Sequence, residues 1–338
     1  MNKPTITFFC ELESQALTNL FHDGHVIDFL KKMDANLSLG LIDLSDQRAE
    51  VVKKLNHVGI PVTAWLLLSK EHGYWTSLDS IHETVVRYAD FKTWAKKHKL
   101  TFSTIGLDIE PKLETISAFA RKPLGQLPVM AKRLLLGSQY EDLEIDARVL
   151  IQKMQTDGYA VETYQFPTVL DERAAHSKVI TKTLGIPALQ SDREVLMLYS
   201  SFFPSHADSI LWSYAREAQA VGVGSTGGGV QIEGIPPLKT LRWIDLKHDL
   251  LLANQAVHHI YIFSLEGCVQ HNYLNRLSNL DWESEIVPPK QSARGITLLR
   301  KSGQGVLWAL SHPLETLLGI ILSAKLIKTL GKLFSGKR

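Results

Sequence analysis

Two carboxylates stand at the end of one strand-like segment, at a position where a buried core is expected. The segment is TFSTIGLDIE, residues 101–110; its apolar residues alternate along one face, while Asp108 and Glu110 share the other. Two neighbouring carboxylates repel each other when both are charged, which raises the pKa of one of them. A protonated Glu beside an ionised Asp is suited to general acid catalysis at a glycosidic oxygen.

Further candidate side chains lie at the ends of four other strand-like segments and just after a fifth. They are Glu11 and Glu13, Tyr74 and Trp75, Glu162 and Tyr164, Met197 and Tyr199, and Ser264 and Glu266. If the segments form one closed parallel barrel, these side chains meet at its C-terminal mouth, where such barrels place their chemistry. We therefore predict that Asp108 and Glu110 face the barrel axis. The alternative for any single acid is a solvated rim residue or an ion-pair partner. The same convergence predicts substrate contacts from Glu11, Tyr74, Trp75, Glu162, Tyr164 and Glu266.

The elements that must position these residues alternate regularly. Helical patterns separate eight strand-like segments, at residues 5–13, 36–44, 60–69, 101–110, 159–166, 194–201, 218–225 and 259–267. Such alternation predicts βαβ units around a parallel sheet. Because no linker or repeat intervenes, we predict a single (β/α)8 TIM barrel, the catalytic domain, over residues 4–285; an open doubly wound sheet is the alternative. The longest interval, residues 111–158, contains two helical patterns and predicts an extra helix or a lid.

The composition fits a large domain without a polyanionic partner. The 338 residues are 45% hydrophobic and carry a formal net charge of +2. The body of the chain has no basic stripe, so we predict no nucleic-acid binding. No apolar segment with a small-residue cleavage site follows the N-terminus, and Cys10 and Cys268 are the only cysteines. These features predict a cytoplasmic protein with two reduced, buried thiols; a disulfide or thiol site between the first and last strands is the alternative.

The end of the fourth segment resembles the signature of glycoside hydrolase family 18, the chitinase-like barrels. That family carries D-G-x-D-x-D-x-E on its fourth strand, and STIGLDIE, residues 103–110, can be laid over it so that Asp108 and Glu110 match the last two acids. The family's M-x-Y pattern on the sixth strand is similar to Met197 and Tyr199. The resemblance implies a glycosidase acting on a glycan or glycoconjugate. Glu110 would protonate the leaving oxygen, Asp108 would orient the substrate's N-acetyl group, and Tyr199 would bond the same group.

The chain departs from the family pattern at several of its acid positions. Ser103 and Gly106 stand where the family has its first two acids, and Ser200 follows the tyrosine where an acid or amide is usual. A carbohydrate-binding barrel without turnover is therefore an alternative function.

A glycine-rich stretch offers another alternative. GVGSTGGGV, residues 222–230, ends the seventh segment, where barrels often bind phosphate through backbone N–H groups. This stretch favours a phosphosugar or phospholipid-headgroup enzyme, although no Gly-Lys-Ser/Thr of a P-loop follows it.

The sequence supports metal chemistry less than it supports the glycosidase and phosphate hypotheses. His22 and His25 form an isolated H-x-x-H with no evident third ligand, so we predict no metal site and no cofactor. The alternative is a divalent ion held by carboxylates at the strand ends: Glu11, Asp108, Glu110 and Glu266.

The last part of the chain, residues 286–338, is expected to be an extension with a basic amphipathic helix. From Leu314 onward, Lys325, Lys328 and Lys332 fall in a narrow sector at 100° per residue, and apolar side chains cover most of the rest. The longest charge-free run there is too short to span a bilayer. We predict peripheral attachment to an anionic membrane surface at the inner face of the cell membrane. A last barrel helix or a dimerisation helix is the alternative.

Overall fold

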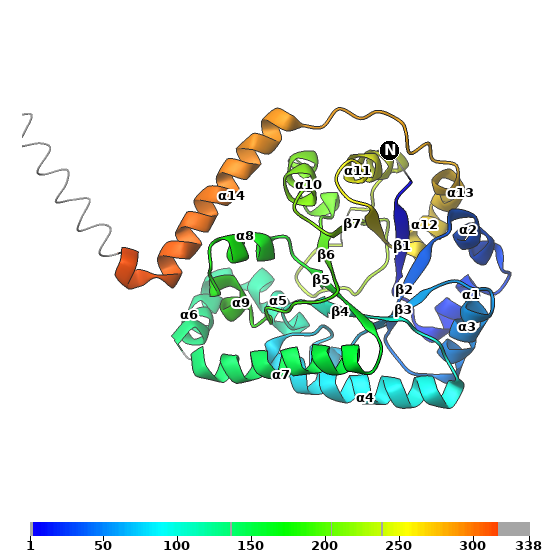
Figure 1. Ribbon diagram of the computed structural model, residues 1–338, viewed down its shortest axis with the longest axis horizontal. Coiled ribbons are helices and arrows are strands. Elements are labelled where there is room, and N and C mark those ends of the chain that lie inside the picture. Colours follow the sequence, from blue (N-terminus) through cyan, green and yellow to red (C-terminus); the bar gives the residue numbers. More distant parts are fainter. Residues whose placement is uncertain (1–2, 136, 204, 238, 317–338) are drawn as a thin grey trace, which may run out of the picture.

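The computed structural model describes residues 3–135, 137–203, 205–237 and 239–316. Eight parallel strands close into a barrel in chain order, and the first strand pairs with the last (Figure 1). The strands are β1 Thr5–Cys10, β2 Asn36–Leu41, β3 Val62–Leu66, β4 Thr104–Ile109, β5 Ala160–Gln165, β6 Arg193–Met197, β7 Ala220–Gly224 and β8 His259–Phe263. The predicted single (β/α)8 barrel is confirmed. Each strand ends one to four residues earlier than its sequence pattern indicated, because the last residues of each segment leave the sheet and enter the loops at the mouth.

Helices surround the barrel and join consecutive strands. They are α1 Ser14–Leu20, α2 His25–Met33, α3 Asp46–His57, α4 Ile81–His98, α5 Leu113–Arg121, α6 Leu127–Leu135, α7 Gly137–Thr156, α8 Thr168–Ala174, α9 Val179–Leu184, α10 Ala207–Ala215, α11 Trp243–Asn254, α12 Leu265–Gln270, α13 Tyr273–Ser278 and α14 Lys290–Ser311. Four short 3-10 turns accompany them: η1 Lys70–His72, η2 Leu78–Ser80, η3 Pro123–Gln126 and η4 Ser200–Phe202. The extra helix predicted for residues 111–158 is confirmed, since α5 and α6 precede α7.

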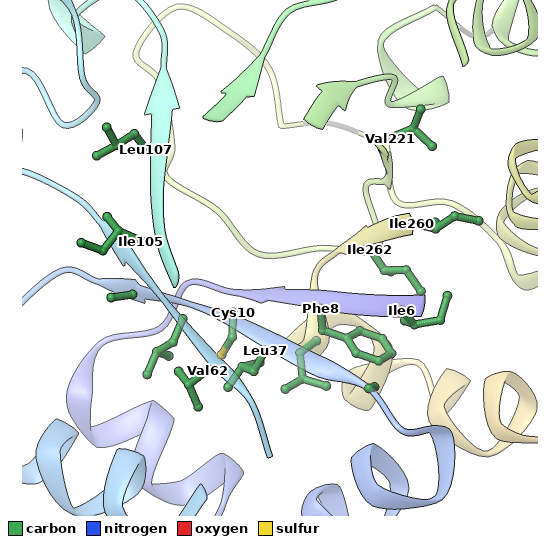
Figure 2. Close-up of a cluster of buried hydrophobic side chains, with 14 of the residues drawn as sticks. Ile6, Phe8, Cys10, Leu37, Val62, Ile105, Leu107, Val221, Ile260 and Ile262 are labelled. Carbon is green, nitrogen blue, oxygen red and sulfur yellow. The ribbon is translucent and has the colours of Figure 1, made fainter. Parts of the chain in front are cut away.

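Each strand divides its residues between two cores. Alternate side chains such as Ile6, Phe8 and Ile105 point outward and pack under the helices (Figure 2). The residues between them point into the barrel, where Phe9 and Trp65 belong to a second, aromatic cluster. The strand parity that places Asp108 and Glu110 on the inner face therefore follows from the same alternation.

The two cysteines are buried free thiols, as predicted. Cys10 ends β1 and belongs to the outer core, and Cys268 lies on α12. Burial raises the pKa of both thiols, that of Cys268 to about 12.

The C-terminal extension begins with α14, which packs across α8 and α10 on the outside of the barrel (Figure 1). Within the described residues, no helix is both long and apolar enough to cross a bilayer. The predicted basic amphipathic helix with Lys325, Lys328 and Lys332 lies in residues 317–338, outside the part of the chain that the structure describes.

Candidate active site

A cavity of about 890 Å³ opens at the C-terminal ends of the strands. Glu11, Asp108, Glu110 and Tyr199 line it together. Its aromatic lining consists of Phe9, Trp65, Trp75, Tyr164, Phe166, Phe202 and Phe263. A concave site of this size, with a few polar groups set among apolar walls, is typical of a small-molecule site. Aromatic rings also suit the apolar faces of sugar rings.

Asp108 and Glu110 lie side by side at the end of β4. Asp108 is 5% exposed, and its backbone oxygen accepts a hydrogen bond from Thr76 N at 2.9 Å, which ties the loop after β3 to this strand end. Burial raises the pKa of Glu110 from 4.5 to about 7. The pKa of Asp108 is also raised, first by burial and then by the charge of Glu110. The pair therefore holds a proton near neutral pH, which is the state that a general acid requires.

Glu11 brings a third carboxyl to the cavity from the end of β1. The Tyr74 hydroxyl donates a hydrogen bond to its Oε1, and Glu11 N donates to Glu266 Oε1 at 3.3 Å. Burial raises the pKa of Glu11 to about 8; the Tyr74 bond opposes this rise, and the charges of Glu266 and Glu110 add to it. Glu11 is therefore protonated at neutral pH and can act as a hydrogen-bond donor.

Tyr74 reaches Glu11 through a constrained loop. Its φ of 70° lies in the left-handed region, which is uncommon for a residue with a side chain. Leu68 N and Tyr74 O join the loop to the end of β3 with a 2.9 Å bond. Strained backbone of this kind is often found at functional sites. Tyr74 thus holds the Glu11 carboxyl without lining the cavity itself, whereas the adjacent Trp75 lines it.

Tyr199, just after β6, shares the cavity with the acid pair. The side chain is 8% exposed. Burial raises the pKa of its hydroxyl, and the charges of Asp108 and Glu110 raise it further. The hydroxyl therefore stays protonated in the cavity that the two acids also line. The structure thus brings Asp108, Glu110 and Tyr199 to one place, while their individual roles stay predictions.

Two other predicted contacts lie deeper in the barrel. Tyr164 forms part of the cavity floor, and its hydroxyl lies 2.7 Å from Ser38 Oγ. Glu162 does not line the cavity: its Oε1 accepts a hydrogen bond from Arg193 Nη1 at 2.7 Å, and its Oε2 accepts one from Tyr164 at 3.4 Å. Glu162 therefore supports the floor, and this placement disagrees with direct contact to a substrate.

Glu266 reaches the site by a different route from the one expected. The prediction that Ser264 and Glu266 end the eighth strand is wrong, because β8 stops at Phe263. Ser264 Oγ instead caps α12 by accepting from Gly267 N at 3.2 Å, and Glu266 lies in the first turn of that helix. Ser is favoured at this position because its hydroxyl accepts a hydrogen bond from a first-turn N–H group that has no partner within the helix. The chain therefore begins a helix where the strand was expected to continue. Glu266 contacts Glu11 rather than lining the cavity.

The loop between β7 and α11, described over residues 225–237 and 239–242, contains the main part of the site that the sequence did not reveal, beyond its glycine-rich start. Its side chains form one wall of the cavity: Val230, Gln231, Ile232, Glu233, Ile235, Pro236, Pro237 and Thr240. Arg121 on α5 pairs with Glu233 at 3.1 Å. Since α5 follows β4, this loop crosses from the β7 side of the mouth to the β4 side. The loop therefore covers the cavity between the β7 side and the β4 side of the mouth.

Trp65 on β3 also belongs to the site, although the pattern of strand ends does not indicate it. The side chain is 2% exposed and lines the cavity floor. Neither its indole nitrogen nor Asp108 Oδ1 has a hydrogen-bond partner. A buried polar atom without a partner is costly, and both of these atoms belong to residues that line the cavity. The inward parity of Trp65 was the signal that could have identified it.

The glycine-rich stretch lies in acidic surroundings. A side chain on Gly228 would collide with the Glu266 carboxylate, and one on Gly229 would lie 3.7 Å from Glu11 Oε2. Gly227 N is already bonded to Ser225 Oγ at 3.1 Å. The Glu266 side chain therefore fills the space beside Gly228, and Gly227 N already has a partner, so this geometry disfavours the phosphate alternative. Among the described residues, no group of three or more His, Cys, Asp or Glu is arranged to hold a metal ion.

Comparisons with known proteins return similar barrels at low identity. No family model and no curated protein matches the chain. The glycoside hydrolase domain of PgaB (BpsB) from Bordetella bronchiseptica is 11% identical, with 84% of this chain and 100% of that chain covered and a TM-score of 0.48. A chain of the tryptophan synthase complex from Pyrococcus furiosus is 14% identical, with 82% and 98% covered and a TM-score of 0.42. The 3-keto-D-glucoside 4-epimerase YcjR from E. coli is 12% identical, with 88% and 100% covered and a TM-score of 0.40. These proteins differ in activity, so any function for this chain must come from its own site.

Proposed function

We propose that the protein is a glycoside hydrolase-like enzyme that acts on a glycan or glycoconjugate. The observation that carries this proposal is the Asp108–Glu110 pair at the floor of an aromatic cavity, with the pKa of Glu110 raised to about 7. Cleavage of a glycosidic bond needs a carboxyl that is still protonated near neutral pH and lies at the leaving oxygen. Glu110 meets the first requirement, and its place in the cavity supports the second.

In the proposed reaction, Glu110 gives its proton to the glycosidic oxygen as the bond to the anomeric carbon breaks. The family resemblance suggests that the carbonyl oxygen of an N-acetyl group forms the new bond to that carbon. Asp108 would orient this group, and the Tyr199 hydroxyl would bond it. Water then opens the resulting ring, and Glu110 takes back a proton. Glu11, protonated and fixed by Tyr74, would donate a hydrogen bond to a sugar hydroxyl.

Hydrolysis of reducing-end-labelled N-acetylhexosamine oligosaccharides tests this proposal. We expect Glu110→Gln to lower kcat/KM about 10²–10⁴-fold, the usual contribution of a general acid. A dinitrophenyl glycoside should be much less affected, because its leaving group departs without a proton. Glu71→Gln, at an exposed carboxyl in the loop after β3, is the matched control.

Two results would contradict the catalytic proposal. Unchanged turnover by folded Glu110→Gln protein on both substrates would remove Glu110 as the acid. Tight oligosaccharide binding without hydrolysis by the wild-type protein would favour the non-catalytic carbohydrate-binding barrel.

A further inference from the structure

The side of α14 that faces the barrel is held mainly by polar contacts. Arg300 donates from Nε to Asp171 Oδ1 at 2.9 Å and from Nη1 to Glu217 Oε1 at 2.8 Å. Its guanidinium lies 3.8 Å from the centre of the Tyr214 ring. Gln304 Nε2 also donates to Asp171 Oδ1, at 2.8 Å. A buried arginine with its partners, rather than an apolar stripe, therefore attaches this helix to α8 and α10.

The opposite side of α14 is apolar and exposed. Leu298, Leu299, Val306 and Leu310 are 67%, 69%, 60% and 62% exposed, and at 100° per residue they fall on one side of the helix. A surface helix normally turns such a stripe toward the core of its own domain. In α14 these four side chains instead face away from the barrel, so they do not contribute to its core. They form a surface suited to a partner.

Positive charges run beside this apolar stripe. Lys290, Arg294 and Lys301 are exposed and fall in one row at helical spacing, next to Leu298. No Asp or Glu occurs between residues 286 and 314, so nothing in the segment neutralises the row. Trp308, 41% exposed, lies near the end of the helix. An apolar stripe flanked by basic residues, with an aromatic ring at one end, is typical of a helix that lies in a membrane interface.

We infer that the outer face of α14, made of this apolar stripe and its basic row, docks the protein on a membrane that carries anionic headgroups. The helix lies in the plane of the interface, with the leucines among the acyl chains and the lysines and arginine at the headgroups. A second copy of the chain is a poorer occupant. Pairing two such faces would bring two unneutralised basic rows together, whereas anionic lipid supplies the missing charge.

Flotation with lipid vesicles tests the inference on the full chain. Vesicles of phosphatidylcholine with 30 mol % phosphatidylglycerol should carry the wild-type protein upward in a density gradient. Binding to phosphatidylcholine alone should be at least tenfold weaker. The double variant Leu298→Asp, Leu299→Asp should lower partitioning tenfold or more, because each leucine that enters the interface contributes roughly a factor of ten. Val86→Asp, on α4 and 60% exposed, is the matched control and should float like the wild type.

A depth measurement separates this face from other membrane contacts. A nitroxide attached at Ser302→Cys lies within the stripe, and both native cysteines are buried. On vesicle addition it should become more accessible to oxygen and less accessible to a nickel complex, whereas a nitroxide at Thr93→Cys on α4 should not change. The triple variant Lys290→Gln, Arg294→Gln, Lys301→Gln should remove the preference for anionic lipid.

Three results would overturn the inference. In the first, the aspartate variant floats like the wild type, and binding is lost only when Lys325, Lys328 and Lys332 are changed to Gln. In the second, sedimentation shows a dimer that the aspartate variant dissociates, with no change in lipid binding. In the third, the nitroxide at residue 302 keeps its aqueous accessibility on bound vesicles.

Discussion

Replacing Glu110 with Gln should stabilise the folded protein above neutral pH, although it removes the proposed acid. Burial raises the pKa of Glu110 from 4.5 to about 7, and one pKa unit corresponds to about 1.4 kcal/mol. Ionising this carboxyl in the folded protein therefore costs up to about 3 kcal/mol, and solvent at the half-buried side chain reduces the cost to about 1–2 kcal/mol. A glutamine has nearly the same shape and no charge, so the cost disappears.

The pH dependence of this effect follows from where the proton binds. Between pH 4.5 and 7 the folded protein binds more protons at Glu110 than the unfolded chain does, so the free energy of unfolding falls as the pH rises. Near pH 5 the folded protein keeps the carboxyl neutral, and Glu110→Gln should change stability little. At pH 8 the carboxyl is charged in both states, and the variant should be more stable by about 1–2 kcal/mol.

Urea unfolding at pH 5, 6, 7 and 8, followed by tryptophan fluorescence, measures this difference. Glu71→Gln, at an exposed carboxyl in the loop after β3, is the control variant. If the difference in stability between Glu110→Gln and the wild type were the same at pH 5 and pH 8, ionising Glu110 in the folded protein would carry no cost. The same would follow if the variant were less stable at pH 8. Such a group is unsuited to donate a proton, and the assignment of Glu110 as the acid would fail.

Three further predictions concern the same cavity. Hydrolysis should decline above about pH 7 as Glu110 loses its proton; a rate that rises through pH 8 would contradict its role. Trp65→Phe should weaken oligosaccharide binding roughly tenfold, because the indole lines the cavity. It should change the free energy of unfolding by less than about 1 kcal/mol, because the buried donor that it removes has no partner. Isothermal calorimetry measures the first effect and urea unfolding the second. Gly228→Ala should destabilise the protein by about 1–3 kcal/mol, because Gly228 has a φ of +84° and a Cβ would collide with Glu266 and Ser264. Protection of the wild-type protein by inorganic phosphate, with loss of that protection in Gly228→Ala, would restore the phosphate alternative.

The barrel and the acid pair could be predicted because both depend on strand periodicity. Alternation with a period of two fixed which side chains face the axis, so Asp108, Glu110 and Tyr199 fell on the inner face and meet in the cavity. Glu11 was found by the same parity. The number of strands could be predicted because strand and helix patterns alternate along the chain. Local residue preferences are enough to produce these patterns.

The loops could not be predicted because their contacts come from distant segments. Tyr74 has a left-handed φ that no local preference favours, and it is held by bonds to the ends of β3 and by Glu11. The loop that follows β7 contacts α5 through a pairing between Glu233 and Arg121, more than one hundred positions apart. Glu266 was misplaced because a Ser cap and a strand residue look alike in an apolar, alternating sequence. For Tyr74 and for the loop, tertiary contacts outweigh the local pattern, whereas for Glu266 a local cap outweighs the strand pattern.

The two acids missing from the family-like pattern have different physical explanations. On β4, Gly106 faces Glu162 of β5, and the ring of Tyr164 lies over it; a Cβ at Gly106 would collide with the Tyr164 hydroxyl, which bonds Ser38 across the barrel. An aspartate there would displace the cavity floor. Ser103 is exposed and precedes β4, at the end of the strand away from the cavity. The chain therefore leaves no room for an acid at Gly106, and its third carboxyl at the cavity comes instead from Glu11, just after β1. Burial therefore raises the pKa of both members of the Asp108–Glu110 pair, and the Glu11 carboxyl raises that of Asp108 further, without additional acids along β4.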